Sequence, residues 1–242
     1  TFSLSASSDT TFPDKLISYF SILSMLTRQL INIPVHLGLD HLPNIYCGVA
    51  VFVLLPLYIM CSKVNAREKI GKCVILLIFL TAFNLNIPNY IWHGMHFPNS
   101  LPCRQSFIYI FFLLAMCYEA VINLKNSTNR QLGASLWIAI GLLLIMEELF
   151  INSETEYSFK SVYISGIFIL IYGLLMFIHN NAKFKIPVVL MLTFSVSIIE
   201  CTMNMDATGI GTTSRTSYLL DYDAVKTVTK TVSDNDTSFY RM

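Results

Sequence analysis

Six stretches of apolar residues constrain the fold of this chain more than any short motif does. A helix needs about 20 apolar residues to cross a hydrocarbon core of about 30 Å. The stretches are separated by polar or charged connections, and they occupy roughly Ile45–Cys61, Cys73–Pro88, Ser106–Leu124, Leu132–Ile151, Ser161–Ile178 and Ile186–Met203. The pattern predicts an all-α fold, a polytopic helical membrane protein with about six transmembrane helices.

The composition agrees with the membrane class and excludes other classes. Charged residues make up 13% of the chain, about half the share found in soluble domains, and the mean hydropathy is +0.59. A net charge of +1 gives no indication of a nucleic-acid partner. The six cysteines form no CxxC pair, so we interpret them as small buried residues. The sequence therefore predicts no metal site and no cofactor.

The loop charges predict how the spans are oriented. Loops with many lysines and arginines stay in the cytoplasm. The connections after spans two and four carry only Arg104 and Lys160, whereas those after spans one, three and five carry Lys63, Arg67, Lys69, Lys72, Lys125, Arg130, Lys183 and Lys185. We therefore predict a multi-pass protein of the cell membrane whose functional loops lie on the extracytoplasmic face.

The chain divides into three predicted segments. Residues 1–42 form an outer-face interfacial segment, because Phe12 to Ile33 has the alternation of an amphipathic helix lying on the membrane surface. Residues 43–203 form the transmembrane domain. Residues 204–242 are rich in Thr, Ser and Asp, and we interpret them as a linker and the truncated start of an outer soluble domain. The chain opens without Met, so we expect a fragment of a longer protein.

The polar loop from Asn84 to Phe107 is the candidate binding site. It places Trp92, His93, His96 and Arg104 where an apolar helix begins. A guanidinium, imidazoles and the free N–H groups at a helix start suit a phosphate. The alternative is interfacial anchoring, since Trp and Arg also collect at the headgroup level. Metal binding by His93 and His96 is disfavoured, because no third ligand is near in the sequence.

Acidic residues within apolar spans are costly and usually have a partner or a role. We expect Glu119 to pair with a cytoplasmic Lys or Arg at the inner end of span three. Three carboxylates near the outer ends of spans four and six are interpreted as reaching headgroup water: Glu147, Glu148 and Glu200. Asp40, between His36 and His41, is the best outer-face carboxylate for a general base.

Several short blocks resemble the YfhO family of bacterial membrane proteins. The most specific block is Asn89–Gly94 with Pro98–Pro102 and Arg104–Phe107. Supporting blocks are Pro43–Gly48, Leu55–Tyr58, Ser214–Arg215 and Ser238–Arg241. The resemblance runs from about Pro43 to the last residue, and it implies a GT-C-like glycosyltransferase membrane domain followed by an outer domain.

The resemblance also implies a function. The family is associated with transferring sugars from polyprenyl-phosphate donors to cell-envelope polymers or lipids, such as teichoic acids, on the outer face. The implied partners are the lipid bilayer, the lipid-linked sugar and the polymer acceptor. GT-C enzymes place a catalytic carboxylate in their first outer loop, and we expect this chain to begin after that loop, so no catalytic residue is assigned. The candidate substrate-binding residues are Arg104, His93, His96, Trp92 and Asp40.

Two other functions stay open at this point. A non-catalytic membrane scaffold would tolerate loss of the polar loop residues. A transporter of envelope precursors would need polar groups near the bilayer midplane, on interrupted helices, whereas the sequence places its carboxylates near the span ends.

Overall fold

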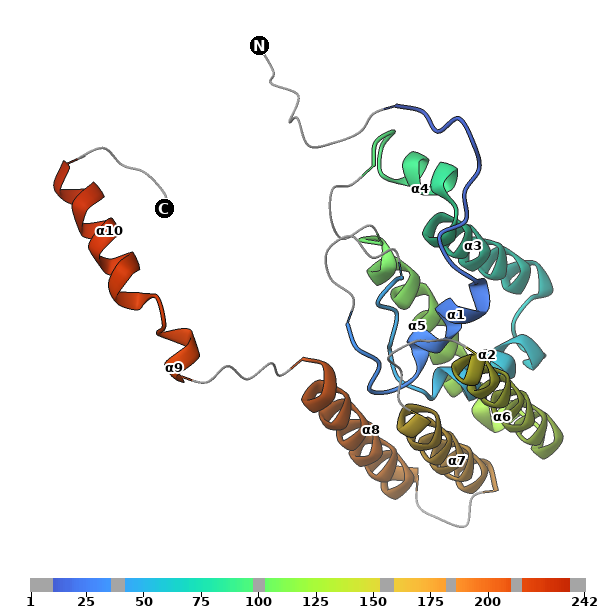
Figure 1. The fold of residues 1–242 in the computed structure, drawn as a ribbon. Helices are drawn as coiled ribbons and strands as arrows, with labels where there is room; N and C mark the ends of the chain where they lie inside the picture. Colours follow the sequence, from blue (N-terminus) through green and yellow to red (C-terminus); the bar gives the residue numbers. More distant parts are fainter. Residues whose placement is uncertain are drawn as a thin grey trace. The chain divides into compact units, whose positions relative to one another are not determined.

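The computed structural model describes residues 11–35, 42–97, 103–152, 159–181, 186–209 and 215–235. The chain forms two units, residues 1–209 and residues 210–242. Helices make up the first unit (Figure 1). Among the described residues the only β-type pairing is a single bridge between Ser18 and Leu85.

Within the residues that the structure describes, three helices are long and apolar enough to cross a membrane. They are α6 (Asn129–Asn152), α7 (Phe159–Asn181) and α8 (Ile186–Thr208), and they correspond to the last three predicted spans. Two further apolar helices in the described part of the chain are shorter, α2 (Val51–Met60) and α5 (Ser106–Ile122). The prediction of six complete spans is therefore supported for three helices.

The first predicted span is helical only in its second half. Residues 45–50 are not helical, and Gly48 has φ +100°, a left-handed conformation that favours glycine. Non-helical backbone inside a protein needs other hydrogen-bond partners. The amide of Gln29 supplies two of them, since its nitrogen donates to the Ile45 carbonyl at 2.8 Å and its oxygen accepts from the Cys47 N–H at 3.1 Å.

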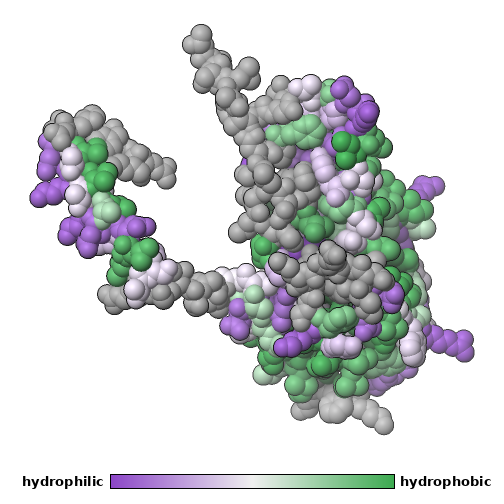
Figure 2. Space-filling view, in the orientation of Figure 1, coloured by the Kyte–Doolittle hydropathy of each residue, from purple (hydrophilic) through white to green (hydrophobic). Residues whose placement is uncertain are grey.

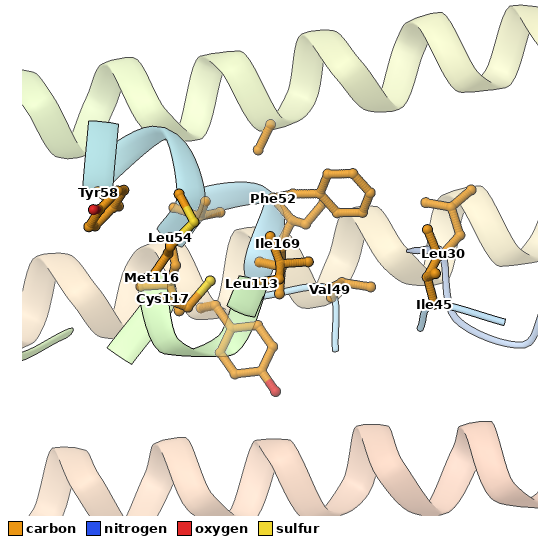
Figure 3. Close-up of a cluster of buried hydrophobic side chains, with 14 of the residues drawn as sticks. Leu30, Ile45, Val49, Phe52, Leu54, Tyr58, Leu113, Met116, Cys117 and Ile169 are labelled. Atoms are coloured by element: carbon orange, nitrogen blue, oxygen red, sulfur yellow. The ribbon is translucent and has the colours of Figure 1, made fainter. Parts of the chain in front are cut away.

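Helix α2 lies at the centre of the bundle and packs against α5, α6 and α7. Figure 3 shows its side chains among those of the neighbouring helices. Phe52 lies beside Leu113 of α5 and Ile169 of α7, and Tyr58 lies nearer Met116. Tyr58 and Leu57 are almost completely buried. Although only ten residues long, α2 therefore organises the hydrophobic core.

The second predicted span is interrupted at Leu85. Helix α3 (Ala66–Asn84) ends there and α4 (Asn86–Trp92) begins immediately after it. In a continuous helix the ring of Pro88 would clash with the carbonyl four residues earlier, which belongs to Asn84. That carbonyl instead accepts the Tyr19 N–H at 2.9 Å.

The N-terminal residues cover this interruption. Phe20 N–H donates to the Asn84 side chain at 3.0 Å, Ile17 N–H donates to the Asn86 side chain at 2.8 Å, and the Asn86 amide donates to the Lys15 carbonyl at 2.8 Å. Residues 15–20 thus pair with the break between α3 and α4.

The prediction of an amphipathic surface helix over Phe12 to Ile33 is wrong. Only α1 (Ile22–Leu26) and the 3-10 turn η1 (Thr27–Gln29) are helical there. Met25 and the residues from Thr27 to Ile31 are buried. The Ile31 N–H donates to Ser165 of α7 and the Asn32 N–H donates to Asn204 of α8. Tertiary contacts with other helices bury Met25, Leu30 and Ile31, whereas the apolar side chains of Leu16, Ile22 and Leu23 remain exposed.

Hydrogen bonds gather basic residues at one end of the first unit, which we call the basic end. Lys69 contacts the last carbonyls of α2, and Lys125 donates to the His179 carbonyl near the end of α7. The turn η2 (Leu124–Asn126) also lies there. The prediction that Glu119 pairs with a basic residue is confirmed, since Lys72 of α3 forms an ion pair with it.

The surface of the first unit is suited to lipid. Hydrophobic residues cover much of the face seen in Figure 2. Helix α8 is the clearest case, with exposed side chains that include Leu190, Met191, Phe194, Ile198 and Ile199. Two of its residues, Val189 and Glu200, are buried.

The second unit contains α9 (Arg215–Tyr218) and α10 (Tyr222–Asn235). Its described side chains are exposed, including Val225 and Val228.

Candidate functional site

The end of α4 fixes the position of His93. Gly94 has φ +73°, its N–H donates to the Ile91 carbonyl, and the Met95 N–H donates to the Tyr90 carbonyl. This pair of bonds is the Schellman ending of a helix, which favours glycine at the left-handed position. His93 is the C-cap residue of α4, so its backbone is held by the helix on one side and by this turn on the other.

One nitrogen of the His93 ring is committed and the other is available. Nδ1 donates to the Asn89 carbonyl at 2.9 Å, so in the neutral ring Nε2 is an acceptor. Within the described residues, the buried Nε2 has no hydrogen-bond partner. Burial lowers the pKa of His93, and the positive charges of His96 and Arg104 lower it further. The ring is therefore mainly neutral at pH 7, with a free lone pair.

The structure brings three of the predicted site residues together. Arg104 and His96 are both close enough to influence the titration of His93, and the two imidazole rings are 6.5 Å apart. Arg104 is exposed and directly precedes the N-cap of α5. Trp92 packs edge to face against Phe79 with ring centroids 4.9 Å apart and is 41% exposed. This contact fits the anchoring alternative for Trp92. Asp40 lies outside the described residues.

The start of α5 differs from the prediction in one respect. The N–H groups of Ser106, Phe107 and Ile108 were expected to face an anion, but those of Ser106 and Ile108 donate to the carbonyls of Cys103 and Gln105. A tight turn uses these donors locally, which is a common way to satisfy helix ends. Two of the three expected main-chain donors are therefore not available to an anion, which makes side-chain donors more important.

Gln105 is a candidate that the sequence reasoning did not single out. It is the N-cap residue of α5 and is only 3% exposed. Neither atom of its side-chain amide has a hydrogen-bond partner within the part of the chain that the structure describes. A buried amide without partners is costly, which makes Gln105 a candidate for binding a ligand. Its place beside Arg104, inside the block that carries the family resemblance, was the available signal.

An apolar cavity of about 340 Å³ begins one helical turn further along α5. Tyr109 and Leu113 form its α5 side, Phe52 and Pro56 its α2 side, and Leu142 its α6 side. The cavity is more than twice the size of an engineered cavity of about 150 Å³ that stays dry and binds benzene. Exposed Ile59 and Ile138 also line it, so it reaches the apolar surface of the bundle. Its chemistry suits a hydrocarbon chain.

Glu200 does not reach headgroup water, and that interpretation is wrong for this residue. Its side chain is 3% exposed and lies about 12 Å along the axis from the end of α8. Oε1 accepts from the Tyr46 hydroxyl at 2.6 Å and from the Val49 N–H at 2.7 Å, and Oε2 accepts from the Tyr172 hydroxyl at 2.6 Å. These three hydrogen bonds replace the water molecules that would otherwise solvate the buried carboxylate. Helix α8 is thereby tied to α7 and to the segment before α2.

The other two carboxylates predicted near the same depth are more accessible. Glu147 accepts from the Tyr163 hydroxyl at 3.0 Å and Glu148 is exposed. Sequence position alone did not separate these glutamates from Glu200, because the tyrosines that surround Glu200 come from distant parts of the chain.

Long apolar helices and an exposed apolar surface define a helical membrane protein, and a polar cluster lies beside an apolar cavity in it. Residues 3–242, almost the entire chain, match the family described as bacterial membrane protein YfhO. The chain therefore belongs to the YfhO family, and the predicted resemblance is confirmed. No curated protein and no solved structure matches it at a significant level.

Proposed function

We propose that the parent protein transfers a sugar from a polyprenyl-phosphate donor to an envelope polymer or lipid on the outer face of the cell membrane. The observation that carries the proposal is the apolar cavity along α5 next to anion-suited side chains, with Arg104 and Gln105 at the start of α5 and His93 at the end of α4. Family membership supplies the reaction class, because a fold alone does not define a function.

The proposed donor lies along α5. Its phosphate meets Arg104, whose planar guanidinium forms two parallel hydrogen bonds to phosphate oxygens. Its isoprenoid chain follows Tyr109 and Leu113 into the apolar cavity. Tyr109 is four residues after Gln105, so the polar and apolar parts of the site are separated by about 6 Å along the helix axis. This spacing supports an amphipathic ligand over a free anion.

The orientation of the site is part of the proposal. The basic end carries Lys69, Lys72 and Lys125, which favours the cytoplasm. The start of α5 lies at the opposite end of that helix from η2. Arg104 and His93 then face the outer leaflet, where a polyprenyl phosphate exposes its charged head.

Replacing Arg104 by alanine tests the proposal directly. We expect donor-lipid binding and sugar transfer by the full-length protein to fall roughly ten- to hundredfold, the effect of losing a charge-assisted pair. Arg104→Lys restores part of the loss, because an ammonium keeps the charge without the planar fork. Arg130→Ala is the matched control, since Arg130 is exposed and begins α6 at the basic end. Activity of Arg104→Ala within twofold of wild type would make Arg104 a headgroup anchor only.

The pH dependence of donor binding tests His93. Its pKa in the free protein is lowered by burial and by the neighbouring positive charges, whereas a bound phosphate favours the protonated ring. Binding therefore takes up a proton, and affinity rises as the pH falls through and below about 6.5, the ordinary histidine value. His93→Gln is expected to abolish this rise of affinity at low pH. The measurement is donor-lipid affinity from pH 7.5 to 5.5 in both proteins, and parallel curves would exclude His93 from the site.

A transporter of envelope precursors is the second candidate, favoured by one observation. Helix α2 is short and α3 and α4 are interrupted at Leu85, as in transporters built on discontinuous helices. Reconstituted protein that moves the lipid-linked sugar between leaflets without transferring the sugar would support this function instead.

A further inference from the structure

A second pocket lies apart from the proposed donor site. Its volume is about 170 Å³, and none of its lining residues lines the apolar cavity except Ile45. Its polar walls come from the N-terminal segment, the segment before α2 and the end of α8: Arg28, Asn44, Tyr46, Asn204 and Thr208. Three separate parts of the chain thus converge on one polar pocket.

The positive charge lies deep in this pocket. Arg28 is only 3% exposed and is the one charged residue among the described lining residues. Its Nε donates to the Pro43 carbonyl at 3.3 Å and its Nη2 donates to Asn44 Oδ1 at 2.6 Å. These bonds fix the plane of the guanidinium. A fixed guanidinium is the side chain best suited to recognise phosphate.

The rim of the pocket is polar on one side and apolar on the other. Asn44 is exposed, and Asn204 and Thr208 are half-buried. Val35, 47% exposed, also lines the pocket, whereas Ile33 is buried. A ligand that enters would meet amide and hydroxyl groups before reaching the guanidinium, with hydrocarbon beside it. This combination matches a lipid headgroup better than a fully hydrated free anion.

The floor of the pocket is held rigid by the buried carboxylate. Tyr46 lines the pocket and donates its hydroxyl to Glu200. Asn204 lies four residues after Glu200 on α8, and its Oδ1 accepts the Asn32 N–H at 2.9 Å. The pocket residues are therefore positioned by contacts among themselves before any ligand binds, which reduces the ordering cost of binding.

We propose that this pocket binds the phosphate group of a membrane lipid headgroup through Arg28, with Asn44, Asn204 and Thr208 around it. The proposal does not depend on the transferase reaction or on the site at Arg104. It adds a second phosphate-recognising site to the same helical unit.

The test is binding of a short-chain phosphatidic acid to the purified full-length protein, followed by native mass spectrometry. Arg28→Gln is expected to weaken binding roughly ten- to hundredfold, the effect of losing charged hydrogen bonds, and Arg28→Lys only in part. Thr208→Leu fills the pocket at the exposed end of α8 without changing its charge, and it also weakens binding at least tenfold. Arg130→Gln, at the basic end, binds as wild type does.

Two further ligands separate the sources of phosphate. A short-chain diacylglycerol, which lacks the phosphate, should bind equally weakly to wild type and to Arg28→Gln. Inorganic phosphate should compete only at far higher concentration than the lipid. If inorganic phosphate binds as tightly as phosphatidic acid, the lipid assignment is overturned.

The variants also cover a failure to fold. If Arg28→Gln does not yield folded protein, Thr208→Leu decides the outcome. Phosphatidic acid binding within twofold of wild type in Thr208→Leu, or in a folded Arg28→Gln, overturns the proposal. If Arg104→Ala loses donor transfer but binds phosphatidic acid as wild type does, the two sites are distinct.

Discussion

Glu200→Ala is expected to lower the free energy of unfolding of the helical unit by about 3 kcal/mol. The substitution leaves two tyrosine hydroxyls and the Val49 N–H without their acceptor in an apolar interior. Helix α8 suffers most, because Val189 and Glu200 are its two buried residues. The thermal unfolding midpoint in detergent should fall by roughly 6–12 °C.

Two smaller substitutions measure how much each tyrosine hydroxyl contributes to this effect. Tyr172→Phe and Tyr46→Phe each remove one hydroxyl and are expected to cost about 1 kcal/mol. Glu148→Ala is the matched control, since Glu148 lies exposed on α6, and its cost should stay within about 0.5 kcal/mol. Equal stabilities of Glu200→Ala and Glu148→Ala would mean that the carboxylate does not hold α8 in place.

Asn86→Ala is expected to release residues 15–20 from the break between α3 and α4. Asn86 is buried, and its side chain accepts the Ile17 and Ile87 N–H groups and donates to the Lys15 carbonyl. Loss of these bonds should cost about 2 kcal/mol. Trypsin cleavage measures the release, because the Lys15 side chain is exposed while the Lys15 carbonyl accepts a hydrogen bond from Asn86. Cleavage after Lys15 should accelerate by roughly tenfold or more, since about 1.4 kcal/mol of easier local opening corresponds to a tenfold change in the open population.

A neutral substitution elsewhere controls for general destabilisation. Asn126 is exposed in the turn η2, so Asn126→Ala should leave cleavage after Lys15 unchanged. If Asn86→Ala is cut at the wild-type rate while remaining folded, the N-terminal segment is held by contacts other than those of Asn86.

The site residues show how far sequence reasoning reached. His93, His96 and Arg104 were placed in one cluster because they share a short loop between apolar segments, and local proximity survives folding. Gln105 was missed because an exposed and a buried glutamine have the same sequence signature. Among the described residues, the Gln105 side-chain amide is buried without a hydrogen-bond partner only because of the way the turn before α5 packs. The donor role assigned to the N–H groups of Ser106 and Ile108 failed for a similar local reason, since that turn consumes them.

The sequence by itself determined the membrane class, the all-helical fold, the family and the ion pair expected for Glu119. Hydropathy over 20 residues and short motifs are local properties, so they can be read without coordinates. Tertiary structure decided where helices are interrupted and which polar groups are buried. The short α2, the break at Leu85, the buried Arg28 and the enclosed Glu200 all depend on partners distant in the chain. Hydrogen bonds to those partners make a buried charge or an interrupted helix tolerable, and no local pattern contains them.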